Sequence, residues 1–175
     1  MHIKNLSTIL FVQLLFPIIC MGQWDTGDTL NLTLVAGGQV FFKYKSLNEI
    51  DNGITYTDWS TFNLYFDNEN GGDVKLTFYS NTGFIFGEDE YKLSLDIIEL
   101  QVNCPGCPGG SVVGGWHPLS DTPTDLINNL PGSDGGTTYI IDVSYRCGDK
   151  ISTGGLLGDT SSYYYVDIIF DVDLE

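Results

Sequence analysis

Apolar and polar side chains alternate along the last long run of the chain, Tyr163–Leu174. In a β-strand successive side chains point to opposite faces, so period two divides this run into a buried face and a wet face. A helix would scatter the aspartates around an apolar stripe, so the pattern favours a strand. The predicted core positions are Tyr164, Val166, Ile168, Phe170 and Val172, and the predicted solvent positions are Asp167, Asp171 and Asp173.

Similar alternation recurs in residues 29–36, 39–45, 61–66, 73–80 and 137–147. Residues 91–103 indicate a further long strand, in which Ile97-Ile98 interrupts the alternation; a bulge or burial on both faces would explain this. Gly37-Gly38 separates the first two segments, either as a turn or as a bulge that moves one long strand between two sheets. Asn70-Gly71 predicts a hairpin between residues 61–66 and 73–80. About seven or eight strands without a convincing helix predict an all-β fold: a two-sheet antiparallel β-sandwich with an immunoglobulin-like or jelly-roll connection.

Two stretches interrupt this pattern. Residues 46–53 are polar and end in the turn signal Asn52-Gly53. Residues 104–136 are rich in glycine and proline and predict a long loop, a feature that in compact domains is usually functional or poorly ordered. Within that loop, residues 125–130 can form one helical turn, with Thr124 as its cap.

The N-terminal residues resemble a secretory signal peptide. A short basic start precedes the apolar residues 9–19, which are too few to span a bilayer, and Gly22 offers a small residue for cleavage. Lipidation at Cys20 is the alternative, although Ile19 is bulky where that signal requires a small residue. We therefore expect residues 1–22 to be a signal peptide and residues 23–175 to be a single secreted domain without a transmembrane segment.

The expected mature chain is strongly acidic. Cleavage removes Lys4 and no acidic residue, which leaves 23 acidic against 6 basic residues and a net charge of −17. This composition excludes the basic footprint that nucleic acid requires, and it disfavours anionic membrane surfaces. Such a surface suits solubility outside the cell and tolerates divalent cations.

Three cysteines remain after cleavage: Cys104, Cys107 and Cys147. Export permits disulfides, and an odd number leaves one thiol over. The local pair Cys104–Cys107 is easiest if the two cysteine-bearing strands are antiparallel neighbours, and Cys107–Cys147 becomes feasible if these strands run parallel or the long loop folds back. The C-x-x-C spacing also occurs in redox motifs, but here no helix follows it. Zinc bound by the three cysteines and His117 is a further, weaker alternative.

The sequence supplies little for catalysis. His117 is the only histidine of the expected mature chain, and no Gly-x-Ser-x-Gly motif is present, so a serine triad is disfavoured. Two carboxylates alone could hydrolyse a glycoside, but an acidic chain offers such pairs by chance. We expect no enzyme and no cofactor, with calcium as an option at Asp67, Glu69 and Asp73 in an oxygen-rich turn.

Aromatic residues form the predicted contact surface. Trp116 and His117 lie in the long loop, and Tyr163 and Tyr165 lie on the outer parity of the last strand. Such residues can bind a glycan or another protein. Trp59, at a strand start, is assigned to the core.

Several sequence pieces in order carry a family resemblance. They are Val40-Phe41-Phe42, then IDNGI at residues 50–54, then Trp59 before Phe62-Asn63-Leu64, and finally Tyr145-Arg146-Cys147-Gly148. Over residues 29–175 this order resembles small secreted β-sandwich proteins of Gram-negative surface proteomes, some of them pilin-like or adhesin-like. The resemblance implies an exported surface or filament module, and it transfers no catalytic residue.

The main hypothesis is therefore a non-catalytic extracellular β-sandwich that acts by surface contact. It would serve as a subunit of a cell-surface or filament assembly or as an adhesin-type module, with other surface proteins or copies of itself as partners. The alternative is a carbohydrate-binding module, with calcium dependence as an option. An exchanged or missing edge strand would favour assembly, because open sheet edges recruit strands from neighbours.

Overall fold

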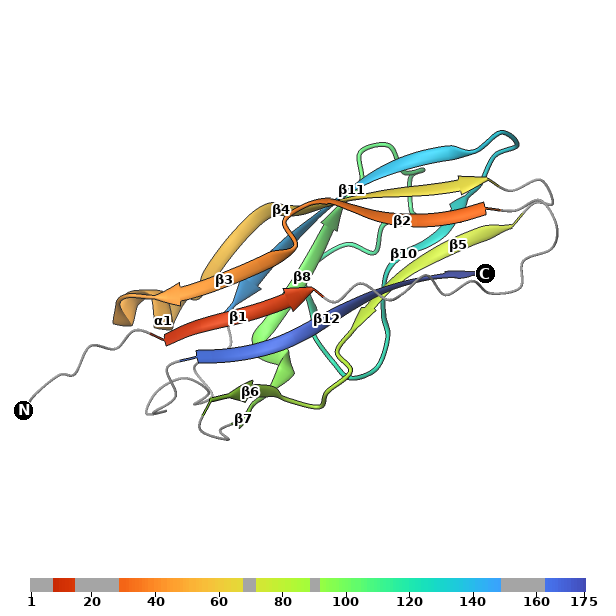
Figure 1. Ribbon diagram of the computed structural model, residues 1–175. Helices are drawn as coiled ribbons and strands as arrows, with labels where there is room; N and C mark the ends of the chain where they lie inside the picture. The colour runs from red at the N-terminus through yellow and green to blue at the C-terminus, as the bar shows by residue number, and fades with distance from the viewer. Residues whose placement is uncertain (1–7, 15–28, 68–71, 89–91, 149–162) are drawn as a thin grey trace, which may run out of the picture.

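A computed structural model describes residues 8–14, 29–67, 72–88, 92–148 and 163–175. Two β-sheets pack face to face, which confirms the predicted all-β sandwich (Figure 1). The seven-stranded sheet has the order β10-β5-β12-β1-β3, and β6 and β7 extend it from β12. Its strands are β1 (Thr8–Leu14), β3 (Gln39–Tyr44), β5 (Asp73–Tyr79), β6 (Ile85–Gly87), β7 (Lys92–Leu93), β10 (Thr124–Pro131) and β12 (Tyr163–Leu174).

The five-stranded sheet has the order β2-β4-β11-β8-β9. Its strands are β2 (Thr29–Ala36), β4 (Ile54–Asp67), β8 (Ile98–Asn103), β9 (His117–Pro118) and β11 (Thr137–Cys147). All its pairings between neighbouring strands are antiparallel. The sandwich core lies between this sheet and the larger one and is lined by buried apolar residues of both.

The predicted parity of β12 is confirmed. Tyr164, Val166, Ile168 and Phe170 are buried, and Phe170 meets Phe62 of the opposite sheet with ring centroids 4.8 Å apart. On the other parity Asp173 is exposed while Asp167 and Asp171 are half-buried, as is Val172 at the end of the core face. Burial of alternate side chains thus determines which face each sheet presents to the other.

The glycine pair moves one long strand from one sheet to the other, as the second alternative predicted. β2 pairs with β4 in the smaller sheet, and β3 continues in the larger sheet. Gly37 has φ +76°, and a Cβ there would lie 2.1 Å from the carbonyl oxygen of Trp59. Only glycine fits, because the backbone is left-handed and another backbone segment touches it.

The predicted hairpin between residues 61–66 and 73–80 is wrong. β4 pairs with β2 and β11, whereas β5 pairs with β10 and β12 in the other sheet. Both strands carry alternating patterns because each has one buried face. They pack face to face across the core instead of edge to edge, and the pattern alone does not distinguish these arrangements.

The predicted loop of residues 104–136 contains two strands, and the helical turn at 125–130 is wrong. Residues Thr124–Pro131 form β10, which pairs with β5. The register shifts twice, and Asn129 has φ 49°. These irregularities break the alternation that would have indicated a strand.

Two short helical segments also depart from the prediction. α1 (Leu47–Asn52) begins with a capping box, in which the Ser46 hydroxyl accepts from the Glu49 amide and the Glu49 carboxylate accepts from the Ser46 amide. The spacing Ser-x-x-Glu was the available signal. In the predicted strand 91–103, a 3₁₀ turn over Leu95–Ile97 separates β7 from β8, at the point where Ile97-Ile98 interrupts the alternation.

Candidate functional site

The candidate site is the position in the larger sheet between β3 and β12, here called the slot. β1 fills it, running parallel to β12 and antiparallel to β3 (Figure 1). Ile9–Leu14 pair with Tyr163–Ile168 on one side, and residues 8–13 pair with residues 39–44 on the other. The strand that fills the slot therefore comes from the segment that the sequence predicts to be a signal peptide.

One wall of the slot, β3, is fastened to the other sheet by three side-chain hydrogen bonds. The Trp59 indole N–H donates to the carbonyl oxygen of Gln39 at 2.8 Å, and the Tyr56 hydroxyl donates to that of Phe41 at 2.9 Å. At the far end the buried Tyr44 hydroxyl donates to the carbonyl oxygen of Cys147 at 2.9 Å. These three bonds attach β3 to β4 and β11 independently of β1.

The first of these bonds corrects the prediction for Trp59. Its side chain is 41% exposed and is not part of the core. The ring lies 4.9 Å from that of Tyr56, measured between centroids. An aromatic residue near a strand start suggested burial, but here the indole spans from β4 to the backbone of β3.

The other wall, β12, is also fastened without β1. Its second half pairs with β5 from Ile169 to Leu174, and Tyr164 and Tyr165 pair with β6. Phe170 anchors the strand to the opposite sheet. Adjacent strands of a sheet lie about 4.8 Å apart, so two fastened walls separated by one strand stand about 10 Å apart.

The inner side of the slot is apolar. Val40, Phe42 and Tyr44 of β3 and Tyr164, Val166 and Ile168 of β12 are all at most 2% exposed. Each slot position carries the number of the β1 residue that occupies it. Slot position 10 lies between Phe42 and Tyr164, and slot position 12 lies between Val40 and Val166. Burial raises the pKa of the Tyr44 hydroxyl far above its usual value, which keeps it neutral as a hydrogen-bond donor. A strand in this slot needs apolar residues at alternate positions.

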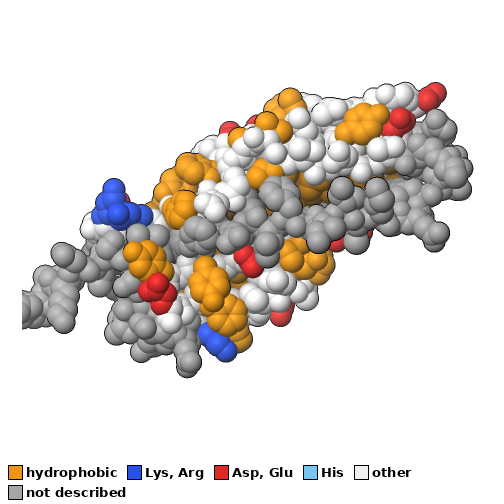
Figure 2. Space-filling view, viewed as in Figure 1, with side chains coloured by type: hydrophobic (Ala, Val, Ile, Leu, Met, Phe, Trp, Pro, Cys, Tyr) orange, Lys and Arg blue, Asp and Glu red, His pale blue; other side chains and the backbone are white. Residues whose placement is uncertain are grey.

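The outer side of the slot is aromatic. Slot position 11 lies between Phe41, which is 42% exposed, and Tyr165, which is 50% exposed. Phe86 pairs with Tyr165, and the two rings are stacked at 6.1 Å between centroids. The Lys92 ammonium lies over the rings of Phe84 and Phe86. Figure 2 shows exposed hydrophobic side chains on this face, over β6 and the beginning of β12.

Sequence reasoning identified only part of this outer surface. Tyr163 and Tyr165 were predicted as contact residues, and both are exposed. Phe41 and Phe86 were missed. Their signal was an aromatic residue on the outward parity of a strand, where a polar residue is usual in a half-wet sheet.

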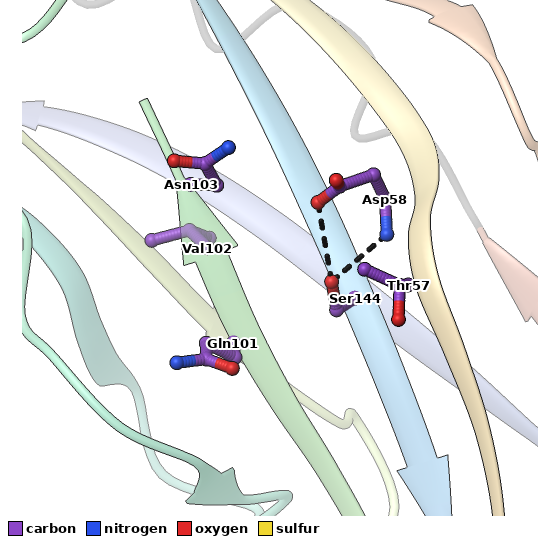
Figure 3. Close-up of a pocket in the computed structure, with 6 residues that line it drawn as sticks. All are labelled: Thr57, Asp58, Gln101, Val102, Asn103 and Ser144. Atoms are coloured by element: carbon purple, nitrogen blue, oxygen red, sulfur yellow. Dashed lines mark hydrogen bonds between the residues drawn. The ribbon is translucent and has the colours of Figure 1, made fainter. Parts of the chain in front are cut away.

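A second, polar hollow lies at a bulge on the smaller sheet (Figure 3). It has a volume of about 320 Å³ and lies where Ser144 of β11 faces a bulged part of β4. Asp58 has φ 49°; its amide donates to the Ser144 hydroxyl at 2.9 Å, and that hydroxyl donates to the Asp58 carboxylate at 3.3 Å. The lining residues are Thr57, Asp58, Gln101, Val102, Asn103 and Ser144. None of these is a histidine that could activate the serine.

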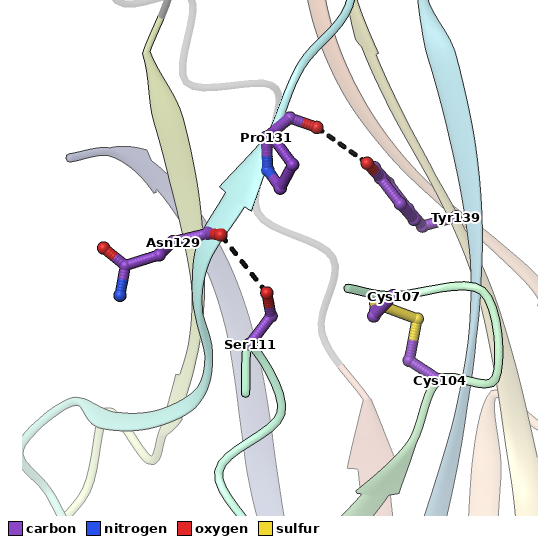
Figure 4. Close-up of a disulfide and its surroundings, with 6 residues drawn as sticks. All are labelled: Cys104, Cys107, Ser111, Asn129, Pro131 and Tyr139. Carbon is purple, nitrogen blue, oxygen red and sulfur yellow. Dashed lines mark hydrogen bonds between the residues drawn. A yellow bond between two sulfur atoms is a disulfide. The ribbon is translucent and has the colours of Figure 1, made fainter. Parts of the chain in front are cut away.

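Cys104 and Cys107 form a disulfide with their Cα atoms 5.3 Å apart, so the local alternative is confirmed (Figure 4). β8 and β11 are antiparallel neighbours, and Cys147 pairs with Ile98 at the end far from Cys104. Cys147 is a buried free thiol whose pKa is raised by burial to about 12. The oxidised pair excludes the zinc site that needed all three thiolates.

His117 begins β9 of the smaller sheet and Trp116 directly precedes it, whereas Tyr163 and Tyr165 belong to β12 of the larger sheet. The Arg146 guanidinium lies 4.7 Å from the centre of the Trp116 ring, and Arg146 also forms an ion pair with Glu99. The Nε2 atom of His117 lies 3.3 Å from the carbonyl oxygen of Val113. The four predicted contact residues therefore do not form one surface.

The predicted calcium ligands remain incomplete. Glu69 lies outside the described residues, and Asp67 accepts a hydrogen bond from the Tyr65 hydroxyl at 3.3 Å. In the part of the chain that the structure describes, no group of three or more histidine, cysteine or acidic residues is arranged to hold a metal ion.

Within the described ranges no helix is long and apolar enough to cross a bilayer. Comparison with protein-family models and with curated proteins finds no match to this chain.

Proposed function

We propose that the mature chain is an extracellular assembly subunit without catalytic activity, and that a second protein completes its larger sheet by adding a strand in the slot. The main support for this proposal is the part of the chain from which β1 comes. The strand between β3 and β12 comes from the predicted signal peptide, so cleavage near Gly22 leaves the slot open.

An open slot is a strong binding site for an extended peptide. Each wall presents backbone groups along six positions, and the inner side presents six buried apolar side chains that would otherwise meet water. Unpaired edges recruit strands, with main-chain hydrogen bonds for affinity and pockets at alternate positions for specificity. The bonds that fasten β3 and β12 hold the walls in place before a partner arrives, which lowers the ordering cost of binding.

The carbohydrate-binding alternative has less support. Trp116, the loop tryptophan on which a sugar ring could stack, already has the Arg146 guanidinium against its ring. The polar hollow at Asp58 and Ser144 has no aromatic residue among those that line it. The outer aromatic surface of the larger sheet lies directly beside the slot, where it serves strand binding.

The first experiment determines the mature N-terminus. The full-length chain is secreted from a Gram-negative host, and its intact mass is measured. A mass that begins at Gln23 is expected. A secreted protein that retains residues 8–14 would contradict the proposal, because β1 would then be a permanent strand.

The second experiment compares two chains, residues 23–175 and residues 8–175. A synthetic peptide of Thr8–Leu14, with one lysine added at each end for solubility, is titrated into both and followed by calorimetry. The shorter chain should bind the peptide and melt at a higher temperature with it, and a scrambled peptide should do neither. The longer chain should not bind, because its slot is filled.

Equal binding to both chains would show that the peptide attaches elsewhere, and the proposal would fail. If the shorter chain is unfolded alone, peptide-induced folding measured by circular dichroism replaces the melting shift. A shorter chain that folds neither alone nor with the peptide, while the longer chain folds, would also refute strand addition from a second molecule.

A further inference from the structure

We propose that the slot selects its partner strand on the outer face as well as the inner one, by requiring a large aromatic residue at slot position 11. This inference rests on the proposed function and specifies the partner: a strand of another polypeptide with apolar residues at positions 10, 12 and 14 and an aromatic residue at position 11.

The cross-strand register provides the first evidence. Phe86, Tyr165, slot position 11 and Phe41 are successive partners across four neighbouring strands. Directly paired positions share a face of the sheet, with Cβ atoms about 5 Å apart. An occupant's residue at position 11 therefore stands between Tyr165 and Phe41, and an aromatic residue there completes a continuous aromatic row.

Exposure provides the second line of evidence. Tyr165 and Phe41 are 50% and 42% exposed, and Phe84, which shares the Lys92 ammonium with Phe86, is 47% exposed. Large apolar side chains gathered on one exposed face typically mark a contact surface. The neighbouring slot positions differ, because position 9 lies between Tyr163 and Lys43 and position 13 lies between Asp167 and Gln39. Among the outward-facing slot positions 9, 11 and 13, position 11 is the only one with an aromatic side chain on both sides.

The segment of the mature chain that directly precedes β2 does not have the sequence pattern that the slot requires. Residues 23–28, QWDTGD, contain a single apolar side chain, Trp24, whereas the inner side of the slot requires three at alternate positions. A polypeptide with a strand of the pattern apolar-aromatic-apolar fits both faces. In the structure, residues 10–12 of the occupant are Leu-Phe-Val.

The test uses the Thr8–Leu14 peptide on the 23–175 chain. Phe11→Ser in the peptide should weaken binding on the order of tenfold, since it puts a small polar residue at the position paired with both Tyr165 and Phe41. Gln13→Ser is the matched control, because it changes the next outward position and should alter binding by less than about twofold.

Variants of the protein test the same contact from the other side. In the Tyr165→Ser protein, the loss of affinity caused by Phe11→Ser in the peptide should be smaller than in the unmodified protein. In the Tyr163→Ser protein, which changes a residue of similar exposure on the same strand, this loss of affinity should be unchanged. Melting temperatures of the unbound variants check that the fold is intact. If Phe11→Ser and Gln13→Ser peptides bind equally, or if Tyr163→Ser acts like Tyr165→Ser, outer-face selection is wrong while strand addition stands. If no peptide binds better than the scrambled control, both proposals fail.

Discussion

Phe170 provides the sharpest test of the core. Its ring is 3% exposed, lies 4.8 Å from that of Phe62 across the sandwich, and belongs to the strand that forms one wall of the slot. Replacing a buried phenylalanine by alanine removes its transfer free energy and leaves a cavity, which together cost about 3–5 kcal/mol. Phe170→Ala should therefore remove a large share of a typical domain stability of about 5–15 kcal/mol.

The assay is urea unfolding of the folded secreted chain, combined with thermal melting. For a domain of this size each kcal/mol corresponds to about 2–4 °C, so the melting temperature should fall by about 6–20 °C. Tyr163→Ala, on the same strand but 45% exposed, is the control and should cost less than about 1 kcal/mol. Equal, small losses for both variants would refute the assignment of β12 parity and the packing of the two sheets.

Three further predictions concern single residues. The Cys147 thiol, buried with a pKa of about 12, should resist alkylation at pH 8 in the folded protein and react after denaturation; rapid labelling of the native protein would contradict its burial. Desolvation raises the pKa of the Asp167 carboxyl, so ionisation costs stability that is regained as the pH falls through this titration. Asp167→Asn should then raise the melting temperature at neutral pH, by an amount that shrinks in acid, and a pH-independent difference would speak against this cause. Gly37→Ala should cost more than about 2 kcal/mol in urea unfolding, since its φ is positive and its Cβ would meet a backbone carbonyl. Gly38→Ala is the milder comparison, because its Cβ would lie 3.2 Å from the Leu34 side chain, and equal losses would argue against the strand switch.

The sequence predicted the faces of the strands better than their partners. Alternation identified the buried sides of β4, β5, β11 and β12, because burial of one face imposes period two wherever a strand lies in the sandwich. It could not show that β4 and β5 belong to different sheets, since an edge partner leaves no trace in the pattern of either strand. β10 was missed because its bulges place the apolar residues out of phase.

The slot was not predictable from the same pattern. An apolar segment after a basic start indicates a signal peptide. Because a signal peptide is cleaved, residues 8–14 were not expected to form a strand of the fold. The sequences of β3 and β12 also do not indicate the slot, because both strands alternate in the same way whether the strand between them belongs to the same chain or to another. Only the three-dimensional order of the strands shows that one segment, β1, lies between the two walls.

The position of the slot strand has a mechanical consequence. A strand in the slot is paired along six positions on each side, parallel to one neighbour and antiparallel to the other. A force along its axis loads both ladders of hydrogen bonds at once in shear, whereas peeling an edge strand breaks its bonds one after another. Resistance to forced separation depends on the rate of rupture and not on the equilibrium constant. A joint of this kind would hold under tension for longer than its affinity alone would suggest, as long as the pull follows the direction of the strand.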